Sequence, residues 1–432
     1  MRDESQKYKL FTRRNFIVTG LNLSLLTLVG SRYFYLQIVE GKKYKDLSER
    51  NHIKIQILPA PRGKLLDRHG KELANDSFVY SLGVEPLKIR QLKVIVPRLE
   101  EALGRPLKIS DKEIERKLLK RTRNMPLILE EELNWEDLAK ISEKLADIEG
   151  AENFRIAIRN YTMGEKAAHI TGYIGAATER EIEQYNLDTF SEVKMGKSGI
   201  EKYYDKDLRG KIGYKKTEVD VKGKVVKDLA QQPYVCGNPL NLTIDRDLQE
   251  FVHDLMMARN IRGAVVVMRV KTGEILAMQS LPTFNPNIFS QGVTKEEWER
   301  LTTGDTNPLI NNAISMPSPP GSTFKPITAL AALRAGVDPE HTVMCTGHFP
   351  LGGHDFKCWK LDGHGRLNMY IAIAQSCNPF FYSTSINIGM NIISETGGML
   401  GYGKKTGVEL PFEHAGIMAS PEWKRGRFIC QL

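Results

Sequence analysis

A long apolar segment near the start of the chain dominates its hydrophobic pattern. Residues Phe16–Leu36 are nearly all apolar, and as a helix they can cross a hydrocarbon core of about 30 Å. Arg13 and Arg14 precede the segment and Tyr33–Tyr35 stand at its far end, which favours a cytoplasmic N-terminus and an aromatic belt at the opposite interface. Polar residues inside the segment leave a buried core helix as the alternative. We predict a cytoplasmic tail over residues 1–15 and an uncleaved transmembrane anchor over residues 16–36.

The middle of the chain is polar and carries no recognisable chemistry. Residues 100–160 are rich in charge and place apolar side chains three or four apart, which predicts solvated helices. Between Gly63 and Gly70 the pattern indicates a short strand and a turn. Gly237–Pro239 is a plausible domain boundary because glycine and proline interrupt regular structure there.

Beyond this boundary, strand and helix patterns alternate. The predicted elements are a strand at Leu240–Ile244, a helix capped by Asp245 with Leu248, Phe251, Val252 and Leu255 on one face, a hairpin of Ala264–Met268 and Glu274–Met278, and a helix from Ser322 to Ala335. Strands flanking helices favour an α/β sandwich for the second half.

Composition excludes several classes of protein. The chain has 432 residues, is 41% hydrophobic and carries a net charge of +9, which is typical of a globular protein of two or three domains. No long basic run is present, so we expect no nucleic-acid binding. Five cysteines are too few for a disulfide scaffold.

The segment Pro319–Lys325 is the first candidate for chemistry. Its prolines and glycine predict a sharp turn into a helix that begins at Ser322. Lys325 stands one helical turn later, on the same face, where its amine could activate the serine hydroxyl if burial lowers the lysine pKa. The alternative is an N-capping serine with an unrelated surface lysine.

A second polar pair supports the catalytic interpretation. Ser376 and Asn378 follow an apolar periodic stretch, Leu367–Ala374. A second hydroxyl could relay a proton to a leaving group, and an amide could hold the lysine and bind a substrate carbonyl.

Ser-x-x-Lys followed by Ser-x-Asn resembles the serine penicillin-recognising enzymes. The wider sequence is similar to class B penicillin-binding proteins, and most closely to the penicillin-binding protein 2 group of rod-shaped Gram-negative bacteria. The segments that carry this likeness are Arg62–Ala74, His169–Gly175, Gly199–Gly210, Thr272–Ala277 and Gly401–Gly407.

The resemblance implies an α+β multidomain fold with a single transmembrane helix. An elongated α+β stalk, or dimerisation, domain would occupy residues 37–236, and a penicillin-binding transpeptidase domain, a β-lactamase-like α/β sandwich, residues 237–432. Ser322 would attack the penultimate D-Ala carbonyl of a peptidoglycan stem peptide. Lys325 would be the base, Ser376 the proton relay and Asn378 an anchor for substrate and lysine, and β-lactams would acylate Ser322.

The family also uses a third motif, Lys-Thr-Gly, on the strand that edges its active site. The triplet at Lys271–Gly273 precedes the nucleophile, and the one at Lys405–Gly407 lies in a segment that is not catalytic in the family. We therefore expect a truncated or frame-disrupted transpeptidase domain that lacks the motif, and its turnover is in question.

Four potential metal ligands lie close together in the sequence. They are Cys345, Cys358, His364 and Cys377. Three thiolates and an imidazole are a tetrahedral zinc set with no open position, so we expect a structural Zn²⁺. The alternative is one disulfide with a free thiol, because the resemblance places this domain in the oxidising periplasm. Zinc on Cys377 would fix the turn that carries Ser376 and Asn378.

The resemblance leaves three functions to separate. The first is a D,D-transpeptidase of the bacterial inner membrane, with its bulk in the periplasm, that cross-links D-Ala-D-Ala stem peptides and binds β-lactams beside an elongation-type glycosyltransferase. The second is a non-catalytic remnant that binds partners. The third is a β-lactam sensor or β-lactamase, which the long stalk argues against.

Overall fold

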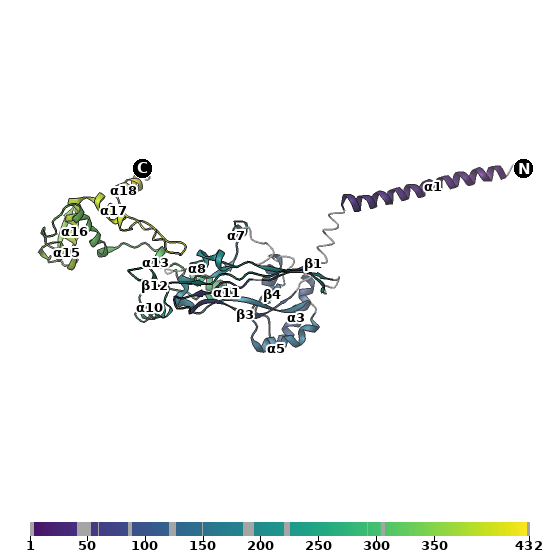
Figure 1. Cartoon of the computed structure of the whole chain (residues 1–432), viewed down its shortest axis with the longest axis horizontal. Coiled ribbons are helices and arrows are strands. Elements are labelled where there is room, and N and C mark those ends of the chain that lie inside the picture. The colour runs from purple at the N-terminus through teal and green to yellow at the C-terminus, as the bar shows by residue number, and fades with distance from the viewer. Residues whose placement is uncertain are drawn as a thin grey trace.

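The computed structural model describes residues 4–40, 53–58, 60–84, 89–120, 127–148, 150–184, 194–219, 225–291, 293–303 and 307–429. Figure 1 shows three parts: the long helix α1, a central body of sheets, and a helical unit with α15–α18 at the end far from α1. Cys430 lies outside the described residues.

Helix α1 (Glu4–Phe34) continues into a π-helical turn, η1 (Tyr35–Val39). The span Asn15–Val39 is long and apolar enough to cross a membrane, and none of its most apolar window is buried within the protein. Two of its hydroxyls bond within the helix, since Thr27 donates to the Leu23 carbonyl and Ser31 to the Thr27 carbonyl. Helix α1 and η1 together include the predicted anchor segment, residues 16–36, and fit a single-pass anchor.

The stalk is built around a long antiparallel ribbon of β3 (Glu72–Val84) and β5 (Ala151–Tyr161). One end of the ribbon is covered by α3 (Ile89–Leu103), α4 (Asp111–Lys120) and α5 (Trp135–Lys144), and the other end packs on the second half of the chain. The core under the helices includes Leu82, Leu99 and Ile141.

The prediction of helices throughout residues 100–160 is correct only in part. Two segments of it, β4 (Leu127–Glu130) and β5, are strands of the stalk sheet, whose order is β10-β2-β3-β4 with β5 on β3. In β5 the apolar residues Phe154, Ile156 and Ile158 recur at every second position, and pairing along the whole of β3 favours the extended form.

Smaller elements complete the stalk. They are β1 (Ile53–Leu58), β2 (Leu65–Leu66), η2 (Leu145–Asp147), η3 (Gly164–Ala167), α6 (Ala168–Thr171), β6 (Ile174–Ala176), α7 (Glu179–Gln184), β7 (Lys194–Gly196), α8 (Gly199–Tyr203), α9 (Asp205–Leu208), β8 (Gly213–Val219), β9 (Val225–Gln232) and β10 (Leu240–Asn241). Strands β1, β8 and β9 form a separate three-stranded sheet.

The second half begins with α10 (Arg246–Ala258) and the hairpin of β11 (Gly263–Met268) and β12 (Ile275–Leu281), as predicted. The Asp245 carboxylate caps α10 by accepting from two backbone N–H groups. The predicted apolar face is partly wrong: Phe251 is 62% exposed, whereas Gln249 and His253 are buried. The Gln249 amide can be buried because it bonds four polar groups around it.

The rest of the chain forms the helical unit and the segments that join it to the central body. Its elements are α11 (Asn287–Gln291), α12 (Lys295–Thr302), α13 (Asn312–Ser315), η4 (Gly321–Phe324), α14 (Lys325–Arg334), β13 (Val343–Cys345), β14 (His348–Leu351), β15 (His354–Lys357), β16 (Gly365–Leu367), α15 (Met369–Ala374), α16 (Asn378–Ile388), α17 (Met390–Met399) and α18 (Pro421–Ile429). The unit has its own core, which includes Ala332, Leu367 and Phe380.

Candidate active site and metal centre

The nucleophile candidate lies in a tight turn before α14. Gly321 has φ +59°, a conformation that glycine adopts without strain, and it opens the 3₁₀ turn η4. Ser322 is exposed in this turn, and the α-helix itself begins at Lys325 rather than at the serine. The predicted helix from Ser322 therefore starts as a tighter turn, which presents the serine to solvent.

The Lys325 amine is held by three oxygens. Its Nζ donates to Ser376 Oγ at 2.9 Å, to Asn378 Oδ1 at 2.7 Å and to the Ser376 carbonyl at 2.7 Å. Three donors meet three acceptors, so the amine is fully bonded and fixed in direction. Burial lowers the pKa of Lys325 from its ordinary value, against the attraction of Cys358 and Cys377.

Ser376 lies between Ser322 and Lys325, the two residues that the sequence pattern pairs. Its hydroxyl donates to Ser322 Oγ at 3.0 Å and accepts from Lys325, so the chain of contacts runs Ser322–Ser376–Lys325. Sequence spacing predicts a direct contact of Lys325 with Ser322. Among the described residues the contact found is the indirect one, through the second serine. The structure brings all four predicted catalytic residues into one hydrogen-bonded set.

The turn that carries Ser376 and Asn378 is held in a strained form. Ser376 has φ +50°, which costs a non-glycine residue roughly 1–3 kcal/mol and persists only where its surroundings impose it. The neighbouring loop supplies two such contacts. Asn378 Nδ2 donates to the Lys357 carbonyl at 3.0 Å, and Trp359 Nε1 donates to the Gln375 carbonyl at 2.9 Å.

Sequence reasoning missed the parts played by Lys357 and Trp359. Lys357 acts through its backbone carbonyl, for which the sequence carries no signal. Trp359 follows the potential ligand Cys358 directly, and this adjacency was the one sign that it could reach the Ser376 turn.

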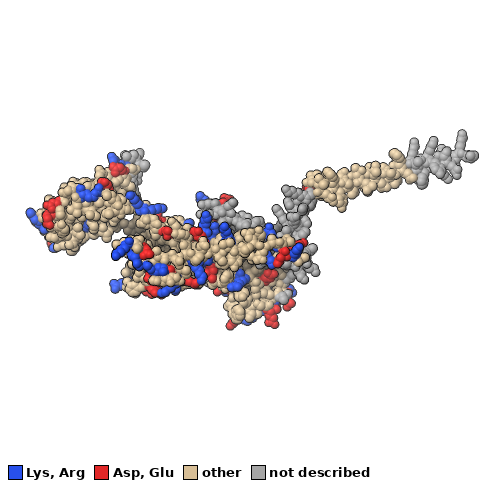
Figure 2. Space-filling view, viewed as in Figure 1, with Lys and Arg blue, Asp and Glu red and all other residues tan. Residues whose placement is uncertain are grey.

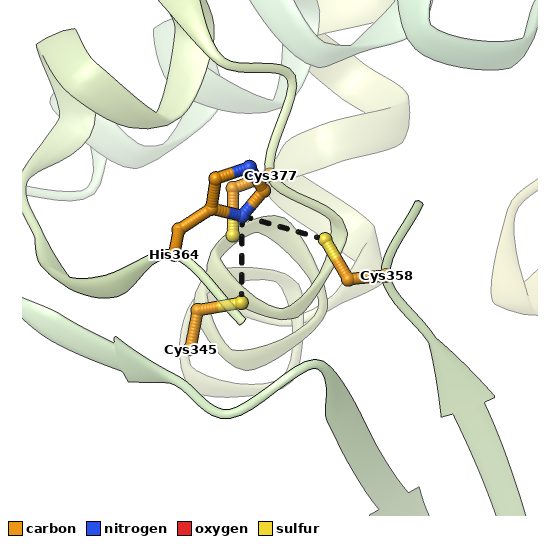
Figure 3. A group of neighbouring side chains, drawn as sticks. All are labelled: Cys345, Cys358, His364 and Cys377. Atoms are coloured by element: carbon orange, nitrogen blue, oxygen red, sulfur yellow. Dashed lines mark hydrogen bonds between the residues drawn. The ribbon is translucent and has the colours of Figure 1, made fainter. Parts of the chain in front are cut away.

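The four potential metal ligands converge beside this turn (Figure 3). Their ligand atoms all lie within 4.8 Å of one another, and the three cysteines are buried. The sulfurs of Cys345 and Cys358 are each 3.6 Å from His364 Nδ1. Tetrahedral zinc, with bonds of about 2.3 Å to sulfur and 2.0–2.1 Å to nitrogen, holds such atoms about 3.6 Å apart.

Burial and backbone hydrogen bonds set the charge of the sulfurs in the cluster. Burial raises the pKa of the Cys377 thiol to about 12, so this sulfur gains a charge only when a positive partner compensates for its lost hydration. The three cysteines are free thiols in the structure. The donor set, its spacing and its burial therefore fit a closed tetrahedral site.

The first Lys-Thr-Gly triplet lies in a hairpin turn and the second in an irregular segment. Lys271–Gly273 connects β11 to β12. In the second triplet, Thr406 bonds the Glu413 carboxylate through both its backbone N–H and its hydroxyl. Neither triplet supplies any of the Ser322 and Lys325 hydrogen bonds given above.

Comparison with known proteins decides the family. The sequence matches a penicillin-binding protein dimerisation domain over residues 57–242 and a penicillin-binding protein transpeptidase domain over residues 263–430. It is 32% identical to peptidoglycan D,D-transpeptidase MrdA of Escherichia coli K12, across 99% of this chain and 68% of that protein. The chain belongs to the penicillin-binding protein 2 family.

Other family members match similarly. MrdA of Acinetobacter baumannii is 32% identical, across 98% of this chain and 63% of its own length. The structure of penicillin-binding protein 2 from Helicobacter pylori in complex with MreC has a TM-score of 0.77 at 29% identity, and covers 87% of this chain and 71% of that one. The chain thus spans roughly two thirds of the length of these MrdA relatives. The expected family and two-domain fold are confirmed.

Proposed function

We propose that this chain is a membrane-anchored peptidoglycan D,D-transpeptidase that acts through an acyl-enzyme on Ser322. The observation that carries the proposal is the hydrogen-bonded set of Ser322, Ser376, Lys325 and Asn378. A serine with a relayed lysine base is suited to acyl transfer from an amide. The names of the MrdA relatives support the same reaction.

The geometry supports the following sequence of proton transfers. When Lys325 is neutral, both hydroxyl hydrogen bonds reverse, so that Ser322 donates to Ser376 and Ser376 donates to the Lys325 lone pair. Ser322 Oγ then attacks the carbonyl carbon of the penultimate D-Ala, and its proton passes to Ser376 while the Ser376 proton passes to Lys325. The tetrahedral intermediate collapses to an ester on Ser322, and Lys325 returns the proton through Ser376 to the departing D-Ala amine. An amine of a neighbouring strand then attacks the ester, which forms the cross-link and frees Ser322.

Lys325 can accept a proton only while its amine is neutral. Burial lowers its pKa, which favours that form, and Asn378 Oδ1 keeps the amine pointed at the relay. A β-lactam contains a strained amide, so it would acylate Ser322 by the same first step.

Two alternatives remain to be separated from this function by experiment. A non-catalytic remnant is favoured because neither Lys-Thr-Gly triplet lies on a strand, whereas the family binds the substrate carboxylate with that motif on a strand. A β-lactam sensor or β-lactamase would share Ser322 and Lys325, but needs no dimerisation domain such as the one matched at residues 57–242.

Labelling with a fluorescent penicillin distinguishes these functions. We expect a covalent band on the full chain in membranes that Ser322→Ala abolishes and the matched control Ser394→Ala retains. No band on the unaltered chain would favour the remnant. A band that fades within seconds as hydrolysed drug accumulates would favour a β-lactamase.

We further propose that Cys345, Cys358, His364 and Cys377 bind a structural Zn²⁺. Four protein ligands leave no open position, so the ion would supply cross-linking of loops rather than Lewis-acid chemistry. Cys377 lies between Ser376 and Asn378, and the loop from Cys358 to His364 contains Trp359, so metal binding would stabilise both sides of the catalytic turn.

The setting of the enzyme follows from its anchor and its relatives. We propose that α1 spans the inner membrane, with the stalk and transpeptidase domains in the periplasm and peptidoglycan stem peptides as the substrate. The H. pylori relative forms a complex with MreC, and a peptidoglycan synthase complex that coordinates polymerisation with cross-linking is also similar, with a TM-score of 0.63 over 96% of this chain. These relatives support an MreC-like partner and an elongation-type glycosyltransferase partner.

A further inference from the structure

A segment near the end of the chain contacts both the nucleophile turn and the stalk. After α17, residues 401–412, here called the strap, leave the helical unit and return to the central body near α13 and α8 (Figure 1). The strap has no helix or strand, yet each part of it is fixed by specific contacts.

Its first part touches the nucleophile turn. The Tyr402 ring packs edge-on against Phe324, with ring centroids 5.6 Å apart at an angle of 81°. Phe324 stands between Thr323 and Lys325 in the same short segment as Ser322, so a change in the position of its ring moves the turn that aims the serine. Tyr402 is itself held, because its backbone N–H donates to the Gly397 carbonyl at the end of α17.

The middle of the strap is held in place by hydrogen bonds to one carboxylate. Glu413 accepts hydrogen bonds from the Thr406 N–H and hydroxyl and from the Gly407 N–H. These bonds lower the pKa of Glu413, against burial, so the clamp is charged at neutral pH. The Lys405-Thr406-Gly407 triplet therefore shapes the strap.

Its last part enters the stalk. Leu410 is 7% exposed and lies in the same core as Leu65 and Tyr161 of the stalk. The Lys202 ammonium of α8 sits 4.6 Å from the centre of the Phe412 ring, and the Phe412 carbonyl accepts from the Ser315 hydroxyl. The strap is thus attached to the stalk at one end and to the nucleophile turn at the other.

We propose that Tyr402 is a positioning residue for Ser322, and that the strap makes its position depend on α8 of the stalk. Movement of α8, for example on partner binding, would pass through Phe412 and the Glu413 clamp to Tyr402 and so to Phe324. The effect of this coupling on catalysis rests on the proposed acyl transfer. The mechanical coupling itself does not.

Hydrogen–deuterium exchange on the full chain in lipid nanodiscs tests the coupling directly. We expect Tyr402→Ala to raise exchange of the amides in the peptide 321–327 about fivefold, because an aromatic pair is lost, and Tyr402→Phe to retain the unaltered rate. Phe412→Ala should raise the same exchange roughly threefold through the lost contact with Lys202. Phe251→Ala, which removes a similarly exposed phenylalanine of α10, is the matched control.

An unaltered exchange rate in Phe412→Ala would overturn the proposal, and so would equal effects of Phe412→Ala and Phe251→Ala. Exchange in β3 and β5 monitors whether each variant is folded. The exchange readout needs no acylation. A chain that no penicillin labels would therefore refute the proposed function and leave this result standing.

Discussion

At the scale of single residues, the central feature is a chain of hydrogen bonds that joins Lys325 to Ser322 through a second serine. Ser376 contacts both Ser322 and Lys325, and its own backbone is strained at φ +50°. If the hydroxyl is the proton relay that we propose, its removal should impair the reaction more than it impairs folding.

Ser376→Ala should lower the rate constant of acylation by a β-lactam about 10²–10⁴-fold, because a positioned proton-transfer group contributes that much. Stopped-flow or quenched labelling at several drug concentrations separates this rate from drug affinity. The matched control Ser385→Ala changes a serine of α16 that lies outside the hydrogen-bonded set. An acylation rate unaffected by Ser376→Ala would show that Lys325 acts on Ser322 without the relay.

A second residue-scale prediction concerns His169, which is buried in the stalk. Its Nε2 donates to the Pro308 carbonyl, and burial lowers its pKa from 6.5 to about 4. Since the unfolded chain binds this proton more readily than the folded one, the stabilisation is complete above pH 6.5 and is lost as the pH falls to about 4. The loss is about 3 kcal/mol, on the scale of 1.4 kcal/mol per pKa unit.

Urea unfolding of the unaltered chain and His169→Gln at pH 7 and pH 4.5 measures this effect. Glutamine can still donate to Pro308 but takes up no proton, so the variant should lose markedly less stability on acidification. The exposed His414→Gln is the control. Equal acid sensitivity of the unaltered chain and His169→Gln would contradict the assigned pKa.

At the scale of elements, the structure was predicted well where it depends on residues close together in the sequence. It was predicted poorly where it depends on residues far apart in the sequence. The β11–β12 hairpin and the Asp245 cap depend on neighbouring residues, and both were correct. The strand β5 was missed because its pairing with β3 bridges a long stretch of sequence. The family resemblance had predicted Ser376 as a proton relay, whereas its contact with Ser322, 54 positions away, comes from the structure.

The proposed zinc site is the element whose removal should be most informative. It consists of Cys345, Cys358, His364 and Cys377. Cys345→Ala removes a proposed zinc ligand on β13, far along the chain from the catalytic turn, so it should abolish stoichiometric zinc in metal analysis and lower the melting temperature of the transpeptidase domain. The exposed, unpaired Cys236→Ala should change neither. If the chain without zinc has the same melting temperature as the unaltered chain, the disulfide alternative would be favoured instead.

At the scale of the whole molecule, charge is distributed over the surface, and a buried cluster of charges lies in the stalk. Figure 2 shows Lys and Arg interspersed with Asp and Glu across the visible face. Inside the stalk, Glu201 is fully buried and bonded to both Arg62 and Arg159. This cluster ties β3 and β5 to α8, which in turn contacts the strap.

Glu201→Gln removes the carboxylate shared by two buried guanidinium groups, which keep Asp205 and Asp76 as partners, and should cost about 1.5–3 kcal/mol of stability. Its control is Glu250→Gln, which disrupts an exposed pair with Lys166 and should cost under about 1 kcal/mol. Chemical denaturation followed by fluorescence measures both. Equal costs would show that the buried cluster is not what joins the stalk elements.

Peptide mapping by mass spectrometry after exposure of the membrane-embedded chain to benzylpenicillin tests the central claim most directly. We predict one drug adduct on the peptide that contains Ser322, absent when Lys325 is replaced by methionine. A chain that stays unmodified, or one modified at a different residue, would contradict the assignment of Ser322 as the acylated nucleophile.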